Sequence, residues 1–192
     1  MASIAYIERS IRSQNVGAPK SDFSSLLRKE HSHGLRVIEL GSGCGIVGIH
    51  IAHLLTKSHV VLSDLDDAMR ILTHNIHHAE VAQDSVLEKM ILDWNQELPA
   101  VVQQQRFDLV VVSDCTYNCD SIPSLVKTIE ALAAHSPSAL ILVSMKVRHA
   151  SEEIFFDLMS RAGLLQAEHD SILLSGMDAG TIDFYVYEKR PN

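Results

Sequence analysis

Four glycines within eight positions separate two apolar runs in the segment RVIELGSGCGIVGIHIA, residues 36–52. The run before them, 36–40, is typical of a short buried strand, and the run from residue 46 to 55 is long enough for a helix. Glycine permits positive φ angles and a close approach of the backbone to a ligand. The segment therefore predicts a strand, a tight turn and a helix, with a ligand site at the turn.

The same alternation of apolar strand and amphipathic helix continues along the chain. We expect strands at 36–40, 59–63, 86–92, 107–113, 139–145, 164–168 and 182–188, and helices at 2–11, 24–29, 46–55, 67–78, 122–134 and 151–162. In the first helix, Ile4, Ile7 and Ile11 share one face at helical spacing. A length of 192 residues suits one domain, with a short helical and loop segment at 1–35 and a core at 36–192.

The central strands are almost entirely apolar, which is typical of parallel strands covered on both faces by helices. The predicted fold class is α/β, a Rossmann-like, doubly wound, mostly parallel seven-stranded sheet with helices on both faces. A turn at 177–181 allows the last strand to pair antiparallel with the strand before it.

In such a sheet, ligands bind beyond the carboxyl ends of the strands. Four of the five central strand ends carry a carboxylate, namely Glu39, Asp64, Asp93 and Asp114. This recurrence predicts a binding site along one edge of the sheet more strongly than any single motif does.

The glycine turn fits two cofactor patterns. Residues 43–48 match the dinucleotide pattern G-x-G-x-x-G, and residues 39–45 match E/D-x-G-x-G-x-G, the first motif of S-adenosylmethionine-dependent methyltransferases. Glu39 favours the second pattern, because its charge would repel a pyrophosphate and attract the ammonium of a methionine moiety. Gly41, Gly43 and Gly45 would then shape the methionine site.

Three further strand ends complete the candidate cofactor site. Asp64 is expected to accept hydrogen bonds from ribose hydroxyls, with Leu65 beside it, while Asp66 or Asp67 would cap the next helix. Asp93 is a candidate acceptor for the adenine amine. Trp94 is either part of the core or a wall of the adenine pocket, and Ser113 ends the fourth strand.

Taken together, VIELGSGCGIVGI, VVLSDLDDAMRILTHNI, LDWN and FDLVVVSDCTYN resemble the class I, seven-stranded methyltransferases, and more narrowly lysine methyltransferase family 16, the methyltransferase-21-like group. The resemblance covers residues 36–134 motif by motif. It implies S-adenosyl-L-methionine as cofactor and a lysine side chain of another protein as substrate. The family's Asp-x-x-Tyr motif matches Asp114 to Tyr117. Nucleobase methyltransferases usually have two prolines at this point, and their absence disfavours that class.

The chemistry of lysine methylation suits this motif. An ammonium with a pKa near 10.4 must lose a proton before it attacks a methyl group. Asp114 can hold the incoming cation, and Tyr117 can stack on it or orient the amine. The alternatives are that Asp114 caps a helix and that Tyr117 packs in the core.

Charge and cysteine content restrict the partners. A net charge of −8 disfavours nucleic acid, and no apolar run has the roughly 20 residues of a membrane helix. Three cysteines without a C-x-x-C pair argue against zinc and disulfides, and methyl transfer from a sulfonium needs no metal. We expect a monomer in the cytoplasm, with the nucleus as a further compatible location.

Two other functions stay open. Family members usually have a longer N-terminal segment with a tryptophan-containing stretch that covers the cofactor, and MASIAYIERS resembles only its end. This difference favours a cofactor-binding module without turnover. A small-molecule amine methyltransferase is the other alternative, with a closed pocket in place of an open groove, and an NAD enzyme is the most remote.

Overall fold

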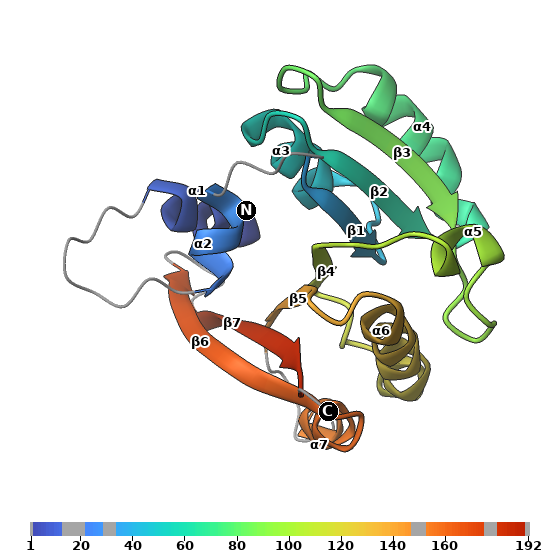
Figure 1. Ribbon diagram of the computed structural model, residues 1–192, viewed down its shortest axis with the longest axis vertical. Helices are drawn as coiled ribbons and strands as arrows, with labels where there is room; N and C mark the ends of the chain where they lie inside the picture. Colours follow the sequence, from blue (N-terminus) through green and yellow to red (C-terminus); the bar gives the residue numbers. More distant parts are fainter. Residues whose placement is uncertain (1, 13–21, 29–33, 147–152, 175–179, 191–192) are drawn as a thin grey trace.

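The computed structural model describes residues 2–12, 22–28, 34–146, 153–174 and 180–190 (Figure 1). Its strands form one seven-stranded sheet in the order β3-β2-β1-β4-β5-β7-β6. Strands β3, β2, β1, β4 and β5 are parallel, whereas β7 is antiparallel to both β5 and β6. The predicted fold class is confirmed. The strand bounds are β1 (Arg36–Leu40), β2 (His59–Asp64), β3 (Val86–Ile91), β4 (Leu109–Ser113), β5 (Leu140–Met145), β6 (Leu164–Leu174) and β7 (Gly180–Lys189).

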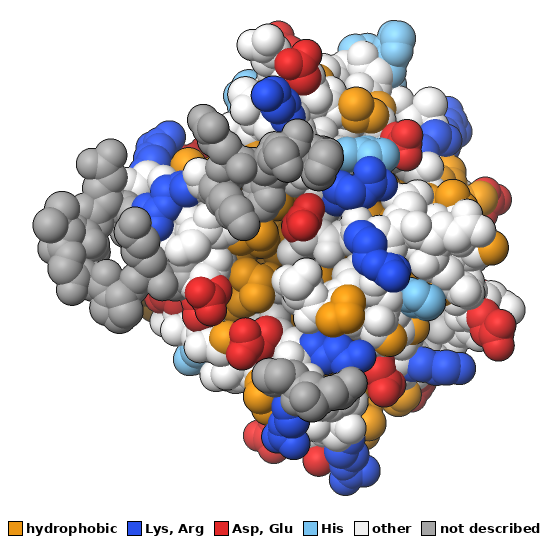
Figure 2. Space-filling view, in the orientation of Figure 1, with side chains coloured by type: hydrophobic (Ala, Val, Ile, Leu, Met, Phe, Trp, Pro, Cys, Tyr) orange, Lys and Arg blue, Asp and Glu red, His pale blue; other side chains and the backbone are white. Residues whose placement is uncertain are grey.

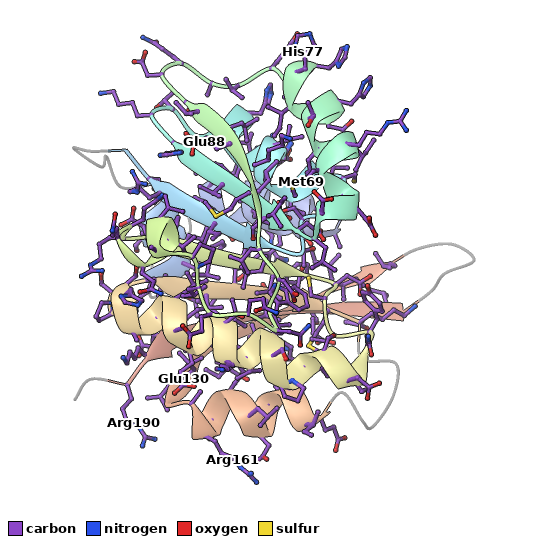
Figure 3. The ribbon with its side chains drawn as sticks, turned by 90° about the vertical axis from the view of Figure 1, so that its right-hand side faces the viewer. Met69, His77, Glu88, Glu130, Arg161 and Arg190 are labelled. Carbon is purple, nitrogen blue, oxygen red and sulfur yellow. The ribbon has the colours of Figure 1, made fainter. Side chains whose placement is uncertain are left out.

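Helices cover both faces of the sheet. One face packs against α1 (Ala2–Arg12), α2 (Asp22–Arg28), α3 (Ile46–Leu54) and α4 (Met69–His77), and the other against α5 (Ala100–Gln103), α6 (Ile122–His135) and α7 (Glu153–Arg161). Successive strand residues serve opposite cores, as the two-residue period of a strand requires: Val37 faces the first group of helices and Ile38 the second. Figure 3 shows α6 and α7 side by side, with Glu130 on α6 and Arg161 on α7.

The first helix forms where it is predicted, but with a different buried face. Ser3, Tyr6, Ile7 and Ser10 are buried, while Ile4 and Ile11 lie at the margins of that face. Tyr6 stacks between two aromatic rings, with centroid distances of 4.4 Å to Phe184 and 5.6 Å to Phe23. Aromatic packing therefore sets the rotation of α1, in place of the isoleucine spacing.

Other differences are local. The strand predicted at 164–168 extends to Leu174, and α5 was not predicted. Asp66 and Asp67 do not cap a helix through their side chains: the short 3-10 helix η1 (Asp66–Ala68) has Leu65 at its N-cap, without a side-chain bond. Residues 29, 151–152 and 177–179 of the predicted elements lie outside the described residues. None of the described helices is both long enough and apolar enough to cross a membrane.

Candidate functional site

The glycine turn connects β1 to α3 with three positive φ angles, 63° at Gly41, 57° at Gly43 and 80° at Gly45. A Cβ at Gly41 would lie 2.7 Å from Cys115 Sγ and 3.1 Å from Trp94 Cζ2, whereas one at Gly43 would meet nothing within 4 Å. Gly41 thus packs against side chains, and Gly43 presents its backbone to open space. A ligand can approach the backbone there.

Glu39, in β1 just before the turn, is buried and bonded to the start of α3. Its side chain is 2% exposed, and its Oε2 atom accepts a hydrogen bond from the Gly48 N–H at 2.9 Å, in the first turn of α3. Burial raises the pKa of Glu39 to about 8, against the opposing effect of the bonds from Gly48 and Ser42. Glu39 stays a predicted cofactor residue, and its described side-chain hydrogen bonds are with Gly48 in α3 and Ser42 in the glycine turn.

Asp64, at the end of β2, joins two segments of the site. Its Oδ2 atom accepts a hydrogen bond from the Gly43 N–H, and its Oδ1 atom accepts one from the Leu65 N–H, both at 2.7 Å. Leu65 beside it is 52% exposed. A carboxylate has about four lone-pair sites, so Asp64 keeps the capacity to accept hydrogen bonds from two ribose hydroxyls.

The segment after β3 is held by a short polar chain. Asp93 Oδ1 accepts hydrogen bonds from the backbone and side-chain N–H groups of Asn95, at 2.9 and 3.0 Å. Asn95 in turn accepts one from the Ser124 hydroxyl on α6 at 2.8 Å. Trp94 is half-buried and packs both on the core and against Gly41. The packing supports the interpretation of Trp94 as a core residue, and its role as a wall of an adenine pocket stays a prediction.

The Asp-x-x-Tyr segment after β4 alternates between surface and core. Asp114 is exposed and Tyr117 is 71% exposed, while Cys115 and Thr116 are buried. Asp114 adopts a φ of 55° and donates its backbone N–H to the Ser144 carbonyl at 2.8 Å. Both alternative interpretations are wrong, because Tyr117 lies outside the core and the cap of the following 3-10 helix, η2 (Cys119–Ser121), is Asn118.

The structure brings these segments together through the sheet. Strands β3, β2, β1 and β4 are consecutive neighbours, and Leu40 pairs with both Ser63 and Val112. The predicted residues at the four strand ends therefore share one edge. Ser113 also lies at this edge, but its hydroxyl contacts two other serine hydroxyls, those of Ser3 and Ser144.

Sequence reasoning missed Ser3 and Ser144 and assigned no role to Asn95, which lies in a strand end that it did indicate; all three support strand-end residues. Ser144 had a detectable signal, a polar residue in an otherwise apolar strand.

His77 lies at the end of α4 (Figure 3), beside His78 with ring centroids 5.2 Å apart. Within the described ranges, no group of three or more His, Cys, Asp or Glu side chains could hold a metal ion.

The sheet order and the glycine turn define a class I methyltransferase fold. Magnesium protoporphyrin IX methyltransferase from Synechocystis, solved with bound S-adenosylmethionine, superimposes with a TM-score of 0.64 at 15% identity, over 98% of this chain and 78% of that one. At this identity the likeness concerns the fold alone.

A family model described as lysine methyltransferase matches residues 1–162. The chain is 31% identical to the protein N-lysine methyltransferase METTL21A of Danio rerio, over 72% of this chain and 62% of the relative. It is 35% identical to the calmodulin-lysine N-methyltransferase of Arabidopsis thaliana, over 66% of this chain and 38% of the relative. The chain thus spans about half the length of the curated relatives it matches, and it belongs to the lysine methyltransferase family.

Proposed function

We propose that this chain binds S-adenosylmethionine at the carboxyl edge of β1–β4 and methylates the ε-amino group of a lysine in another protein. Family membership supports the reaction, and the methyltransferase fold supports the cofactor. The observation that carries the proposal is the pair of exposed side chains, Asp114 and Tyr117, in the segment that follows β4, the strand that pairs with β1 before the glycine turn.

The residues along the edge fit the cofactor. The open backbone at Gly43 can receive the methionine moiety, and Asp64 can accept hydrogen bonds from the ribose. Asp93, Trp94 and the exposed side chain of Leu65 would bound the adenine. When bound, the cofactor supplies an electrophilic methyl group on a sulfonium.

The acceptor would enter at the end of β4. Asp114 attracts the lysine ammonium, and the Tyr117 ring can stack on the aliphatic stem or on the cation. The ammonium releases its proton to solvent, because only the neutral amine has a lone pair for the attack. Asp114 would hold the neutral amine in line with the methyl group that the bound cofactor would supply, so that the N–C bond could form as the S–C bond breaks.

The exposure of this edge favours a protein substrate over a small amine. A small-molecule enzyme would enclose the acceptor, whereas Tyr117 is 71% exposed. On the face that Figure 2 shows, Lys and Arg side chains are interspersed with Asp and Glu, and the net charge is −8. This charge supports a protein substrate rather than nucleic acid. We also propose that the protein acts as a monomer, in the cytoplasm or the nucleus.

Two assays test it. Titration with S-adenosylhomocysteine should show saturable binding that NADH does not reproduce, and Asp64→Ala should weaken it by about 1–3 kcal/mol. The exposed Asp67→Ala, in the same segment, should bind normally. Incubation with labelled S-adenosylmethionine and a cell lysate should transfer label to lysines of a protein. Binding without any transfer would favour the module without turnover.

A further inference from the structure

Three serine hydroxyls from three separate elements meet beside the acceptor segment. Ser3 lies on α1, Ser113 ends β4 and Ser144 is in β5. Their hydroxyl oxygens are 3.1 Å (Ser3–Ser113), 2.9 Å (Ser3–Ser144) and 3.0 Å (Ser113–Ser144) apart. Each hydroxyl has one proton to donate, so three hydroxyls can form three mutual hydrogen bonds in a closed ring. We call these three residues the serine ring.

The serine ring adjoins the backbone of Asp114 on two sides. Ser113 precedes Asp114 in the chain, and the Ser144 carbonyl accepts the Asp114 N–H at 2.8 Å. Asp114 itself has a φ of 55°, a left-handed conformation that the surroundings of a non-glycine residue must stabilise. Two of the residues that fix this backbone therefore belong to the serine ring.

The third member, Ser3, is positioned by the packing of α1 and not by β4 or β5. It shares the buried face of α1 with Tyr6 and Ile7, and stacking of Tyr6 on Phe184 anchors that face to β7. Ser3 is 8% exposed and Ser144 4%, so the hydroxyl bond between them is largely shielded from water, which would otherwise replace a lost partner. The docking of α1 is thus coupled through one hydroxyl to the ends of β4 and β5.

We propose that Ser3 is a positioning residue for the acceptor amine, acting through the serine ring on the backbone of Asp114. The inference rests on the proposed function, in which Asp114 receives the lysine ammonium. Ser3 does not touch the amine. Its hydroxyl restricts the two strand ends, so that the Asp114 side chain stays at the exposed edge in one orientation.

The test uses the full chain and three variants. Ser3→Ala opens the serine ring from the helix side, and Ser144→Ala opens it from the strand side. Ser10→Ala is the matched control, because Ser10 lies on the same buried face of α1 and its hydroxyl bonds only within that helix in the described contacts, to the Tyr6 carbonyl at 2.9 Å. Ser3→Thr restores a hydroxyl at the same position.

The first measurement is amide hydrogen exchange, resolved at Asp114 by NMR, which does not depend on turnover. Exchange should be about tenfold faster in Ser3→Ala and Ser144→Ala, and unchanged in Ser10→Ala. Unchanged exchange at Asp114 in both ring variants would overturn the proposal.

The second measurement is methyl transfer at saturating cofactor. In Ser3→Ala, kcat should fall about tenfold while KM for S-adenosylmethionine stays within about twofold, and Ser3→Thr should recover most of the loss. Faster exchange with an unchanged kcat would overturn the positioning role. If the wild-type chain methylates no lysine, the proposed function fails and the exchange measurement alone decides whether the serine ring holds Asp114.

Discussion

The ring of Trp94 lies against Gly41, so closely that a Cβ at Gly41 would be 3.1 Å from Cζ2 and 3.3 Å from Cη2. Cys115 Sγ closes the other side of the same space, at 2.7 Å from that Cβ position. One glycine is thus enclosed by the segments that follow β3 and β4. Its missing side chain lets the segments after β3 and β4, where we propose that the adenine and the acceptor bind, meet at the turn.

Gly41→Ala should therefore destabilise the fold and weaken cofactor binding together. The new methyl group would displace Trp94 or Cys115, and the φ of 63° adds backbone strain, for a total of about 2–4 kcal/mol in unfolding free energy. Gly163→Ala is the matched control, because Gly163 has a φ of 72° and nothing within 4 Å of a Cβ. Chemical denaturation and S-adenosylhomocysteine titration measure both effects. Equal losses in the two variants would show that strain alone acts.

The second prediction concerns the pH dependence that Glu39 imposes. The pKa of its carboxyl is raised from 4.5 to about 8 by burial, so between these values the folded state keeps a proton that the unfolded state has released. Stability must then fall as pH rises through this window, by at most about 1.4 kcal/mol per pH unit from this one group.

Glu39→Gln should flatten that decline, because an amide oxygen can still accept the Gly48 N–H but does not ionise. Glu130→Gln, an exposed change on α6, should leave the decline as it is in the wild type. Urea denaturation at pH 5, 6, 7 and 8 compares the three proteins. A Glu39→Gln curve parallel to the wild-type curve would contradict the raised pKa.

Apolar continuity made the sheet predictable. Strands such as LVVVS and LILVSM pack on both faces, so their pattern shows them to be central, and their carboxyl ends then mark the edge where ligands bind. The pattern of α1 misled in one respect. Ile4, Ile7 and Ile11 predict a face, yet Ser3 and Tyr6 are buried because their partners, Ser144 and Phe184, lie far along the chain. A local period cannot contain that information.

Roles within the site were less predictable than their location. The Glu39 carboxyl was expected beside a methionine ammonium, and the structure directs it to the Gly48 N–H. A Cβ at Gly48 would lie 2.7 Å from Glu39 Oε2, so a larger residue at position 48 would displace the Glu39 carboxyl. The cofactor motifs do not indicate that Gly48 makes room for this carboxyl. The direction of a buried side chain depends on the space around it, which the sequence does not display.

The two cysteines nearest the site should differ in reactivity. Cys44 is exposed in the glycine turn, whereas Cys115 is 5% exposed and burial raises the pKa of its thiol to about 12. Because the thiolate is the reactive form, iodoacetamide should label Cys44 much faster than Cys115 at pH 8. Saturating S-adenosylhomocysteine should slow the labelling of Cys44, because the bound ligand would cover the glycine turn. Mass spectrometry of peptides after timed labelling measures both rates, and faster labelling of Cys115 would contradict its burial.

Asp114 provides a specific test of the site, because one substitution can remove the charge of its carboxylate while leaving its backbone conformation unchanged. Asparagine tolerates a φ of 55° nearly as well as aspartate, so Asp114→Asn should change the unfolding free energy by less than about 1 kcal/mol. If the charge orients the lysine ammonium, methyl transfer should fall by about 10²-fold, a barrier increase of about 2.7 kcal/mol.

Two comparison variants complete the design. Asp114→Ala should lose the same activity and also about 1 kcal/mol of stability, because alanine is strained in the left-handed region. Asp120→Asn, an exposed change in η2 a few residues along, should keep both activity and stability. Melting curves and initial rates with one protein substrate compare all four proteins. Full activity in a folded Asp114→Asn would place the recognition of the ammonium elsewhere on the edge, with Tyr117 as the next residue to replace, because its ring is the other exposed side chain of the segment.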